Sequence, residues 1–277
     1  MNGGTKNRLF NTNRHRGDNL ELNSFNLQSG RIVDTQKNYR RTTILANQSV
    51  VDGTERIIAE GVNTLGLLIT FPATARLLSI ASTSVNDTAL GSGGRTVLIE
   101  GLDANNDDQE EVITLNGQTP VNTIKTWNRI NIFELISSGS SNTNEGIMYC
   151  SDNTDTFVLG VPQNRVYNIC GIGETISKTG IFSLARNKKA LFRFMLASTD
   201  ISGASNRLVF NFKRTSKGLT SDKTRFLTET FYLDRTAQID VSWFRRIDGT
   251  DDVELSAFTT GGSAAISAKV DIIVFDT

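Results

Sequence analysis

The sequence contains very little proline, cysteine and histidine: 3 prolines, 2 cysteines and 1 histidine in 277 residues. With 23 glycines against 3 prolines, chain reversals fall to Gly, Asn, Asp and Ser, a composition that favours many short strands joined by turns. The only histidine, His15, lies in a polar stretch, so the usual zinc ligand sets and a histidine-activated Ser or Cys nucleophile are not available. We therefore expect no catalytic residues, no metal site and no cofactor.

Long apolar runs are also missing. No stretch approaches the roughly 18 apolar residues of a membrane span, and the opening residues MNGGTKNRLFNTNRHR lack the apolar core of a signal peptide. These absences predict a protein that folds in a cytoplasm and has no membrane partner. Cys150 and Cys170 stand in apolar surroundings, which predicts two small buried hydrophobic residues rather than a disulfide.

The formal net charge is zero, but the charge is segregated along the chain. Residues 1–45 hold 8 basic and 3 acidic side chains, a net charge of +5. Residues 46–160 hold 5 basic and 14 acidic side chains, a net charge of −9. Residues 161–277 hold 16 basic and 12 acidic side chains, a net charge of +4. Such asymmetry can steer one copy of a protein onto another, or onto a charged partner, although solvated charge that happens to cluster would look the same.

Residues 1–45 show no sustained hydrophobic period and are rich in Asn, Gly and Arg. They are too polar to build a core, yet they carry scattered large apolar residues, as an arm that orders against a partner would. A disordered tail is the alternative. We predict an extended basic arm over residues 1–45 and a β-sandwich body over 46–277, either undivided or in two lobes, 46–160 and 161–277. The candidate assembly residues of the arm are Arg8, Arg14, Arg16, Arg31, Arg40 and Arg41.

The rest of the chain has the two-residue period of strands. The candidate strands are residues 76–83, 95–102, 110–117, 128–135, 156–161, 190–198, 207–215, 224–233, 237–247 and 264–276. In RLVFNFKRT the residues Leu208, Phe210 and Phe212 fall on one face, and Phe244 marks a possible bulge in the strand that contains Trp243. About ten strands at this spacing predict an all-β fold, an antiparallel β-sandwich of jelly-roll type.

One segment also fits a helix. VNTIKTWNRINIF places Val121, Ile124, Trp127 and Ile130 at helical spacing. Its β-branched residues and the alternation of Ile130 with Ile132 favour a strand, and no other stretch predicts a helix of any length.

Residues 91–117, GSGGRTVLIEGLDANNDDQEEVITLNG, open with glycines and are crowded with carboxylates in the middle. A phosphate-binding loop needs a lysine after its last glycine and then a helix, but Arg95 and a strand pattern follow here. An EF-hand calcium loop needs a glycine at its sixth position and a glutamate at its twelfth, where this chain has Asp108 and Thr114. The alternation on both sides instead predicts a hairpin with Asp103–Asp108 as its solvated turn, and adventitious calcium at this turn is the minor alternative.

Other motifs carry little chemistry. DGTDD, residues 248–252, is explained by an Asp-Gly turn without a metal. ARNKKALFRF, residues 185–194, mixes cations with Phe192 and Phe194 in a way that could touch nucleic acid, but a solvated turn that leads into an amphipathic strand explains it better. A pair of carboxylates for glycoside cleavage exists in any acidic chain, and nothing here favours one.

Two stretches resemble a known group of proteins. STSVNDTALGSGGRTVLIEGLDANNDDQEEVITLNGQTPV (82–121) and NRINIFELISSGSSNTNEGIMY (128–149) resemble a segment that recurs in virion structural proteins of tailed phages, especially phages of aquatic bacteria. The pattern there is an Asn-Asp-Thr turn, an Ala-Arg-Thr-Val strand, Gly-Leu-Asp, and a Glu-Thr-Val-Thr-Leu-Asn-Gly strand. This chain has Gly94 in place of the alanine and Glu111-Val-Ile in place of Glu-Thr-Val. A looser likeness extends over most of residues 75–277 and leaves the arm uncovered.

The resemblance implies a non-enzymatic particle component, such as a capsid-decorating, head–tail or fibre-associated protein, with no binding residues to carry over. The expected partners are copies of the chain itself and other virion proteins, major capsid or tail proteins, and the expected location is the virion after folding in the host cytoplasm. The alternative is a receptor- or glycan-binding module that uses Trp127, Trp243 or Tyr232 as an aromatic platform on a host-surface glycan. A hydrolase is a third and weaker hypothesis.

Overall fold

The structure is a computed structural model that describes residues 25–26, 31–32, 39–60, 67–201, 207–217, 224–234 and 237–276. The chain divides into two units, residues 1–38 and residues 39–277. In the first unit the described residues form the antiparallel pair β1 (Phe25–Asn26) and β2 (Arg31–Ile32). Throughout the described ranges the regular elements are β-strands that pair antiparallel, which confirms the predicted all-β antiparallel class. Within these ranges no helix is long and apolar enough to cross a membrane.

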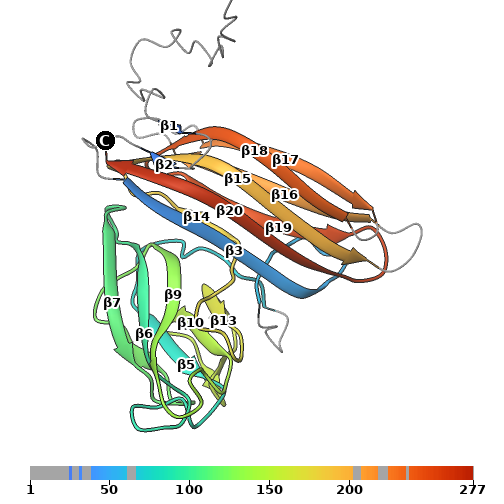
Figure 1. The fold of residues 1–277 in the computed structure, drawn as a ribbon. Coiled ribbons are helices and arrows are strands. Elements are labelled where there is room, and N and C mark those ends of the chain that lie inside the picture. The colour runs from blue at the N-terminus through green and yellow to red at the C-terminus, as the bar shows by residue number, and fades with distance from the viewer. Residues whose placement is uncertain are drawn as a thin grey trace, which may run out of the picture. The chain divides into compact units, whose positions relative to one another are not determined.

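Two long sheets pack face to face in residues 39–60 and 179–276, which we call the two-sheet lobe (Figure 1). The first sheet holds, in spatial order, β18 (Ala237–Asp248), β15 (Lys188–Ile201), β20 (Ala264–Asp276) and β3 (Tyr39–Val51). The second holds β14 (Ile181–Ser183), β19 (Asp252–Thr259), β16 (Arg207–Lys217) and β17 (Thr224–Asp234), and β4 (Arg56–Ile57) also pairs with β19. Among the described strands, β18 and β3 therefore stand at the ends of the first sheet, and β14 and β17 at the ends of the second. The jelly-roll type of connection stays a prediction.

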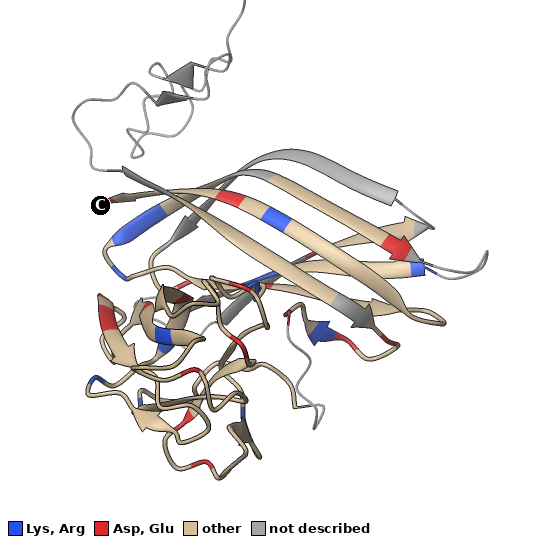
Figure 2. Ribbon diagram, turned by 60° about the horizontal axis from the view of Figure 1, so that its bottom comes forward, with Lys and Arg blue, Asp and Glu red and all other residues tan. Residues whose placement is uncertain are grey.

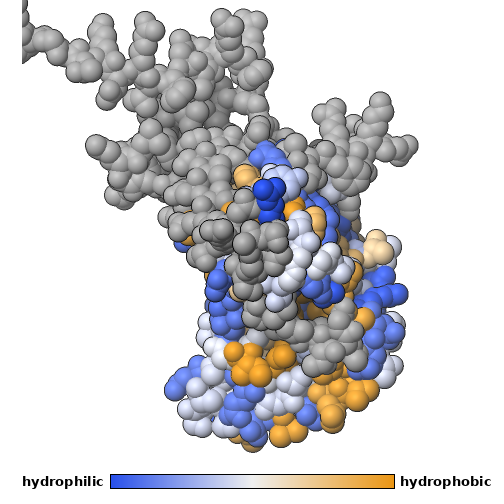
Figure 3. Space-filling view, turned by 90° about the vertical axis from the view of Figure 1, so that its right-hand side faces the viewer, coloured by the Kyte–Doolittle hydropathy of each residue, from blue (hydrophilic) through white to orange (hydrophobic). Residues whose placement is uncertain are grey.

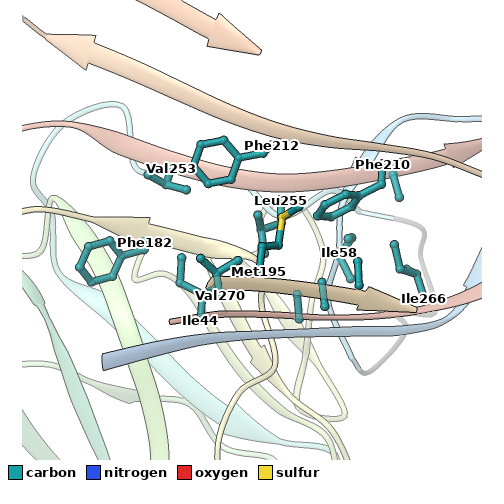
Figure 4. Packing of buried hydrophobic residues seen from close by; sticks show 14 of the residues in the cluster. Ile44, Ile58, Phe182, Met195, Phe210, Phe212, Val253, Leu255, Ile266 and Val270 are labelled. Carbon is teal, nitrogen blue, oxygen red and sulfur yellow. The ribbon is translucent and has the colours of Figure 1, made fainter. Parts of the chain in front are cut away.

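The core of the two-sheet lobe lies between its sheets (Figure 4). In Figure 4 side chains from both sheets point into one shared layer, among them Met195 of the first sheet and Leu255 of the second. The rings of Phe192 and Phe212 meet edge to face there, with centroids 5.0 Å apart, a geometry that aromatic pairs prefer. The alternation along each strand is what places one apolar face in this layer.

Residues 67–178 form a second lobe, the inserted lobe, with a core of its own. One sheet holds β13 (Asn168–Cys170), β10 (Met148–Asp152), β5 (Leu78–Ser82) and β8 (Val121–Asn122). Another holds β7 (Asp108–Thr114), β6 (Gly94–Leu102) and β9 (Arg129–Ser138), and β11 (Phe157–Val158) pairs with β12 (Val161–Pro162). Cys150 and Cys170 are buried free thiols, as predicted, and burial raises the pKa of Cys170 to about 12.

The inserted lobe begins and ends at one place on the two-sheet lobe. Ala59 and Thr179 form an antiparallel bridge, and the amide of Glu60 donates to the carbonyl of Lys178 at 3.3 Å. The Lys178 ammonium also lies 3.1 Å from the Glu60 carboxylate. The core of the two-sheet lobe draws on residues 44–58 and 182–272, and that of the inserted lobe on residues 78–170. The two cores thus divide the chain differently from the predicted lobes 46–160 and 161–277.

Most long strands lie where the alternation predicts them. Leu208, Phe210 and Phe212 are all buried in the core, as predicted. The bulge predicted at Phe244 is confirmed by a register shift in β18, where Ser242 and Arg245 pair with β15 residues only two positions apart. The segment with helical spacing forms β8 and β9 instead of a helix.

Candidate interaction surfaces

The six arginines predicted for the arm fall into different parts of the chain. Three of them lie outside the described residues: Arg8, Arg14 and Arg16. Arg31 begins β2 in the first unit. Arg40 and Arg41 lie in β3, whose backbone pairs with β20, so both belong to a sheet of the two-sheet lobe.

Asp87 is a carboxylate with 0% exposure inside the inserted lobe. Its Oδ1 accepts hydrogen bonds from the amides of Gly94 at 2.6 Å and Glu145 at 2.9 Å. Its Oδ2 accepts from the amide of Gly146 at 2.9 Å and from the hydroxyl of Ser82. A buried charge is tolerated when donors surround it in this way. Asp87 therefore ties together the end of β5, the start of β6 and the loop before β10.

The glycines at the start of residues 91–117 make this arrangement sterically possible. A Cβ at Gly93 would lie 2.1 Å from Asp87 Oδ1, and one at Gly91 would lie 1.9 Å from the carbonyl oxygen of Asn86. The glycine-rich loop does wrap an anion, but the anion is the chain's own carboxylate rather than a phosphate. Sequence reasoning missed Asp87 because an aspartate in a turn and a buried one look alike, and the glycines beside it were the only available signal.

The turn between β6 and β7 forms the predicted hairpin. Asp103 Oδ1 accepts from two amides of its own turn, at 2.7 and 2.9 Å. Asp107 pairs with Nε of Arg186 at 2.7 Å, and Asp108 lies 3.8 Å from the ammonium of Lys188. In the part of the chain that the structure describes, no three His, Cys, Asp or Glu side chains are placed to hold a metal ion. The carboxylates of this turn instead fix the hairpin against the residues around the start of β15.

A buried ion pair links the two lobes. Arg129 of β9 donates through Nε and an NH2 nitrogen to the two carboxylate oxygens of Asp252 in β19, each at 2.8 Å, and both side chains are buried. Another nitrogen of Arg129 donates to the carbonyls of Pro72 and Asn128, at 3.2 and 2.6 Å. The guanidinium carbon also lies 4.8 Å from the ring centroid of Phe71. Bidentate geometry and further acceptors for the other guanidinium donors are what make such a buried pair tolerable.

The hairpin of β11 and β12 corrects the prediction of a single strand over residues 156–161. Its two loop residues, Leu159 and Gly160, have φ of +51° and +80°, and positive φ at both positions is the mark of a type I′ turn, which favours Asn-Gly. A leucine in the left-handed region costs roughly 1–2 kcal/mol. Leu159 is also 70% exposed, so neither its backbone nor its side chain is explained by the fold of the described chain.

Leu159 is one of a set of exposed apolar residues, which we call the apical surface. Its members are Val85, Leu90, Val158 and Leu159, each between 52% and 93% exposed. The loop of Leu159 adjoins the end of β5, since a Cβ at Gly160 would lie 1.8 Å from the carbonyl oxygen of Ser82. Leu90 and Val85 are close in the backbone, since a Cβ at Gly91 would lie 1.9 Å from the carbonyl oxygen of Asn86. Figure 3 shows patches of apolar side chains over the lower part of the molecule, where the inserted lobe lies. Exposed apolar clusters of this kind mark interaction sites.

The three aromatic platforms considered for a glycan have different environments. Trp127 is 0% exposed and belongs to the core of the inserted lobe, so it is not a platform. Tyr232 of β17 is exposed. The side chain of Trp243 in β18 lies outside the described part of the chain.

The charge of the inserted lobe is strongly negative. Residues 67–178 contain 6 basic and 12 acidic side chains, a net charge of −6, whereas residues 1–38 contain 6 and 3, a net charge of +3. Figure 2 shows the acidic residues spread over this lobe rather than gathered at one point. Opposite charges of this kind attract over about 10 Å at roughly 0.1 M salt.

Comparison with known proteins gives only distant likenesses. The chain is 11% identical to a chain in the structure of infectious bursal disease virus Gt strain, with 89% of this chain and 73% of that chain covered and a TM-score of 0.23. For a chain of the Gx strain the identity is 14%, with 91% of this chain and 76% of that chain covered, and the TM-score is 0.24. A bacterial lipoprotein of Bacteroides thetaiotaomicron is 11% identical, with 84% of this chain and 99% of that chain covered and a TM-score of 0.19. TM-scores this low do not establish a common fold. No protein-family model and no curated protein matches the sequence.

Proposed function

We propose that this chain is a non-enzymatic structural protein of a tailed-phage virion. It assembles with copies of itself and with neighbouring capsid or tail subunits, as a capsid-decorating (cement) or head–tail component. Contact is made through the apical surface and the basic N-terminal segment, after the chain has folded in the host cytoplasm. The jelly-roll connection and the virion location belong to the same proposal.

Leu159 is the observation that carries the proposal. At the tip of a two-residue hairpin, glycine or asparagine would suit the isolated fold better than leucine. The leucine stores backbone strain and leaves an apolar side chain in water. Strain of this kind concentrates at functional positions, where a partner compensates for it. Burial of Leu159 and its apical neighbours against another subunit supplies such compensation.

Two further observations support assembly rather than catalysis. The stretch that resembles phage virion proteins, residues 82–121, contains both Asp87 and part of the apical surface. The carboxylates that could have suggested chemistry, such as Asp87 and Asp103, serve as acceptors for backbone amides. The net charge of +3 on residues 1–38 and −6 on the inserted lobe also favours contact between the arm of one copy and the lobe of the next.

The test is sedimentation velocity of the full chain over a concentration series, alone and with assembled particles. We expect self-association or co-sedimentation that Leu159→Asn weakens at least about tenfold, although the same change stabilises the free chain by about 1 kcal/mol because asparagine tolerates positive φ. Ile124→Asn makes a comparable change at an exposed residue held beside β7 by Glu111, and it leaves association unchanged.

The arm is tested in the same experiment. Replacement of Arg8, Arg14 and Arg16 together by glutamine should weaken the association at about 0.02 M salt more than at about 0.5 M, because salt screens these charges. A native chain that stays monomeric at high concentration and never sediments with particles refutes the proposal.

Receptor or glycan binding is the second candidate function. The exposed Tyr232 alone gives it little support, but a pocket on the inserted lobe gives it a specific site.

A further inference from the structure

The inserted lobe contains a pocket of about 300 Å³ between residues 68–76 and residues 164–167. This volume lies at the small end of the range for ligand sites. The lining residues that matter here are Leu68, Phe71, Arg76, Asn164, Arg165 and Tyr167. They combine two cations with an apolar and aromatic surface.

Both arginines of the pocket are anchored by one carboxylate, Asp152, whose side chain is only 2% exposed. Arg76 and Arg165 each donate to Oδ2 of Asp152, the latter at 2.9 Å. The other oxygen, Oδ1, accepts from the amide and hydroxyl of Thr154 at 3.0 and 2.9 Å. Asp152 therefore holds the two guanidinium groups in place before any ligand arrives, and preorganisation of this kind favours binding.

The backbone that carries Arg165 is fixed separately. Asp155 accepts from the amide of Arg165 at 2.9 Å and from the side-chain amide of Asn164 at 2.7 Å. The Arg165 side chain itself is 54% exposed. Because a guanidinium has five N–H donors and Asp152 occupies few of them, Arg165 keeps donors for a ligand.

The charge of the pocket runs against that of the lobe around it. The inserted lobe has a net charge of −6 and only 6 basic residues, and 2 of these 6, Arg76 and Arg165, line this one cavity. None of the lining residues is acidic, although the buried Asp152 pairs with both arginines and offsets part of their charge. The exposed Arg165 still gives the cavity a cationic side chain that favours an anionic group.

The rest of the lining is suited to a ring. Phe71 offers aromatic surface and Leu68 is partly exposed beside it, whereas Tyr167 is only 2% exposed and belongs to the core of the lobe. The guanidinium of Arg129 lies over the ring of Phe71, 4.8 Å from its centroid, and helps to hold it in position. Sugars bind proteins through an apolar ring face on an aromatic side chain together with hydrogen bonds from fixed polar groups.

We propose that this pocket binds an acidic monosaccharide unit, with the sugar carboxylate on Arg165, beside Arg76, and the ring against Phe71. Arginine suits this role because its planar fork matches a carboxylate. The site goes beyond assembly, since it would let a particle that carries this protein attach to acidic polysaccharide on a host surface.

The experiment is calorimetric titration of the full chain with methyl β-glucuronide and with the methyl glycoside of N-acetylneuraminic acid, beside neutral methyl β-glucoside. We expect saturable binding of at least one acidic sugar and none of the neutral sugar. Arg165→Gln should weaken the binding at least about tenfold, the effect of a lost charge-assisted hydrogen bond. Arg95→Gln, the same change in the same lobe but outside the pocket, should leave the affinity unchanged.

The unfolding midpoint of each variant in urea is measured in parallel, so that lost binding is not confused with lost folding. Should Arg165→Gln unfold, Phe71→Leu replaces it and is expected to weaken binding while the chain stays folded. The proposal is overturned if neither acidic sugar binds saturably, if the neutral sugar binds equally well, or if the pocket variant binds like the native chain. None of these measurements depends on self-association, so failure here is distinct from failure of the assembly proposal.

Discussion

The replacement Asp87→Asn tests whether one end of the inserted lobe is built around a buried carboxylate. In the native chain the carboxylate accepts from three backbone amides and one hydroxyl. The asparagine NH2 must take one of the two oxygen positions. The NH2 group costs less free energy at the Oδ2 position, where it faces the amide of Gly146 and the hydroxyl of Ser82, because the hydroxyl can rotate and accept a hydrogen bond from it.

The magnitude follows from this orientation. One buried backbone amide is left without an acceptor, which costs about 1–3 kcal/mol. The two remaining backbone hydrogen bonds lose their ionic partner, which costs about 1 kcal/mol each, because hydrogen bonds to charged groups are roughly twice as strong as neutral ones. The free energy of unfolding of the lobe should therefore fall by about 3–5 kcal/mol.

The assay is urea unfolding followed by tryptophan fluorescence in a Trp243→Phe background. The remaining Trp127 is fully buried in the core of the inserted lobe, so its emission reports the unfolding of this lobe. The control is Glu110→Gln, the same chemical change at an exposed position of β7, with an expected effect within about 0.5 kcal/mol. A loss below about 1 kcal/mol for Asp87→Asn, indistinguishable from this control, would refute the reasoning.

Two predictions concern buried ion pairs. Burial by itself raises the pKa of Asp152, but hydrogen bonds from Thr154 and Arg76 and the charge of Arg76 outweigh it and lower the pKa from 3.8 to about 2. The resulting stability, about 2 kcal/mol, is fully present well above pH 3.8 and is lost as the pH falls through about 2, so the urea midpoint of the native chain should drop over this range more than that of Asp152→Asn. Arg129→Ala leaves Asp252 buried without its cation and should lower the free energy of unfolding by about 3–5 kcal/mol. Arg129→Lys should restore only part of this, since lysine lacks the planar fork, and an unchanged midpoint for the alanine variant contradicts the link between the lobes.

The long strands were predictable because alternation persists over many residues. In β16, for example, Leu208, Phe210 and Phe212 repeat every second position, and all three are buried. The short strands β10 and β13 were missed because all their residues are buried, so they show no alternation. Strand β3 was placed partly in the arm, since it begins with Tyr39, Arg40 and Arg41 and is rich in polar residues.

The buried polar groups could not be read from the sequence. Arg129 finds Asp252 at a separation of 123 residues, and Asp87 finds Glu145 and Gly146 across 58 and 59 residues. No local pattern distinguishes such side chains from solvated ones. The sequence pattern predicts a strand through Leu159, because leucine is rare at positive φ and the glycine after it is the only signal of a turn.

The side-by-side placement of residues 60 and 178 makes the inserted lobe separable in design as well as in description. A segment whose two ends already touch can be exchanged for another of any length at little cost in loop closure, since the ends need not be brought together anew. The two-sheet lobe can thus serve as a scaffold that stays unchanged, and the contact between Glu60 and Lys178 marks the position at which different domains can be inserted. A foreign domain spliced there would be displayed without alteration of the strands that build the scaffold.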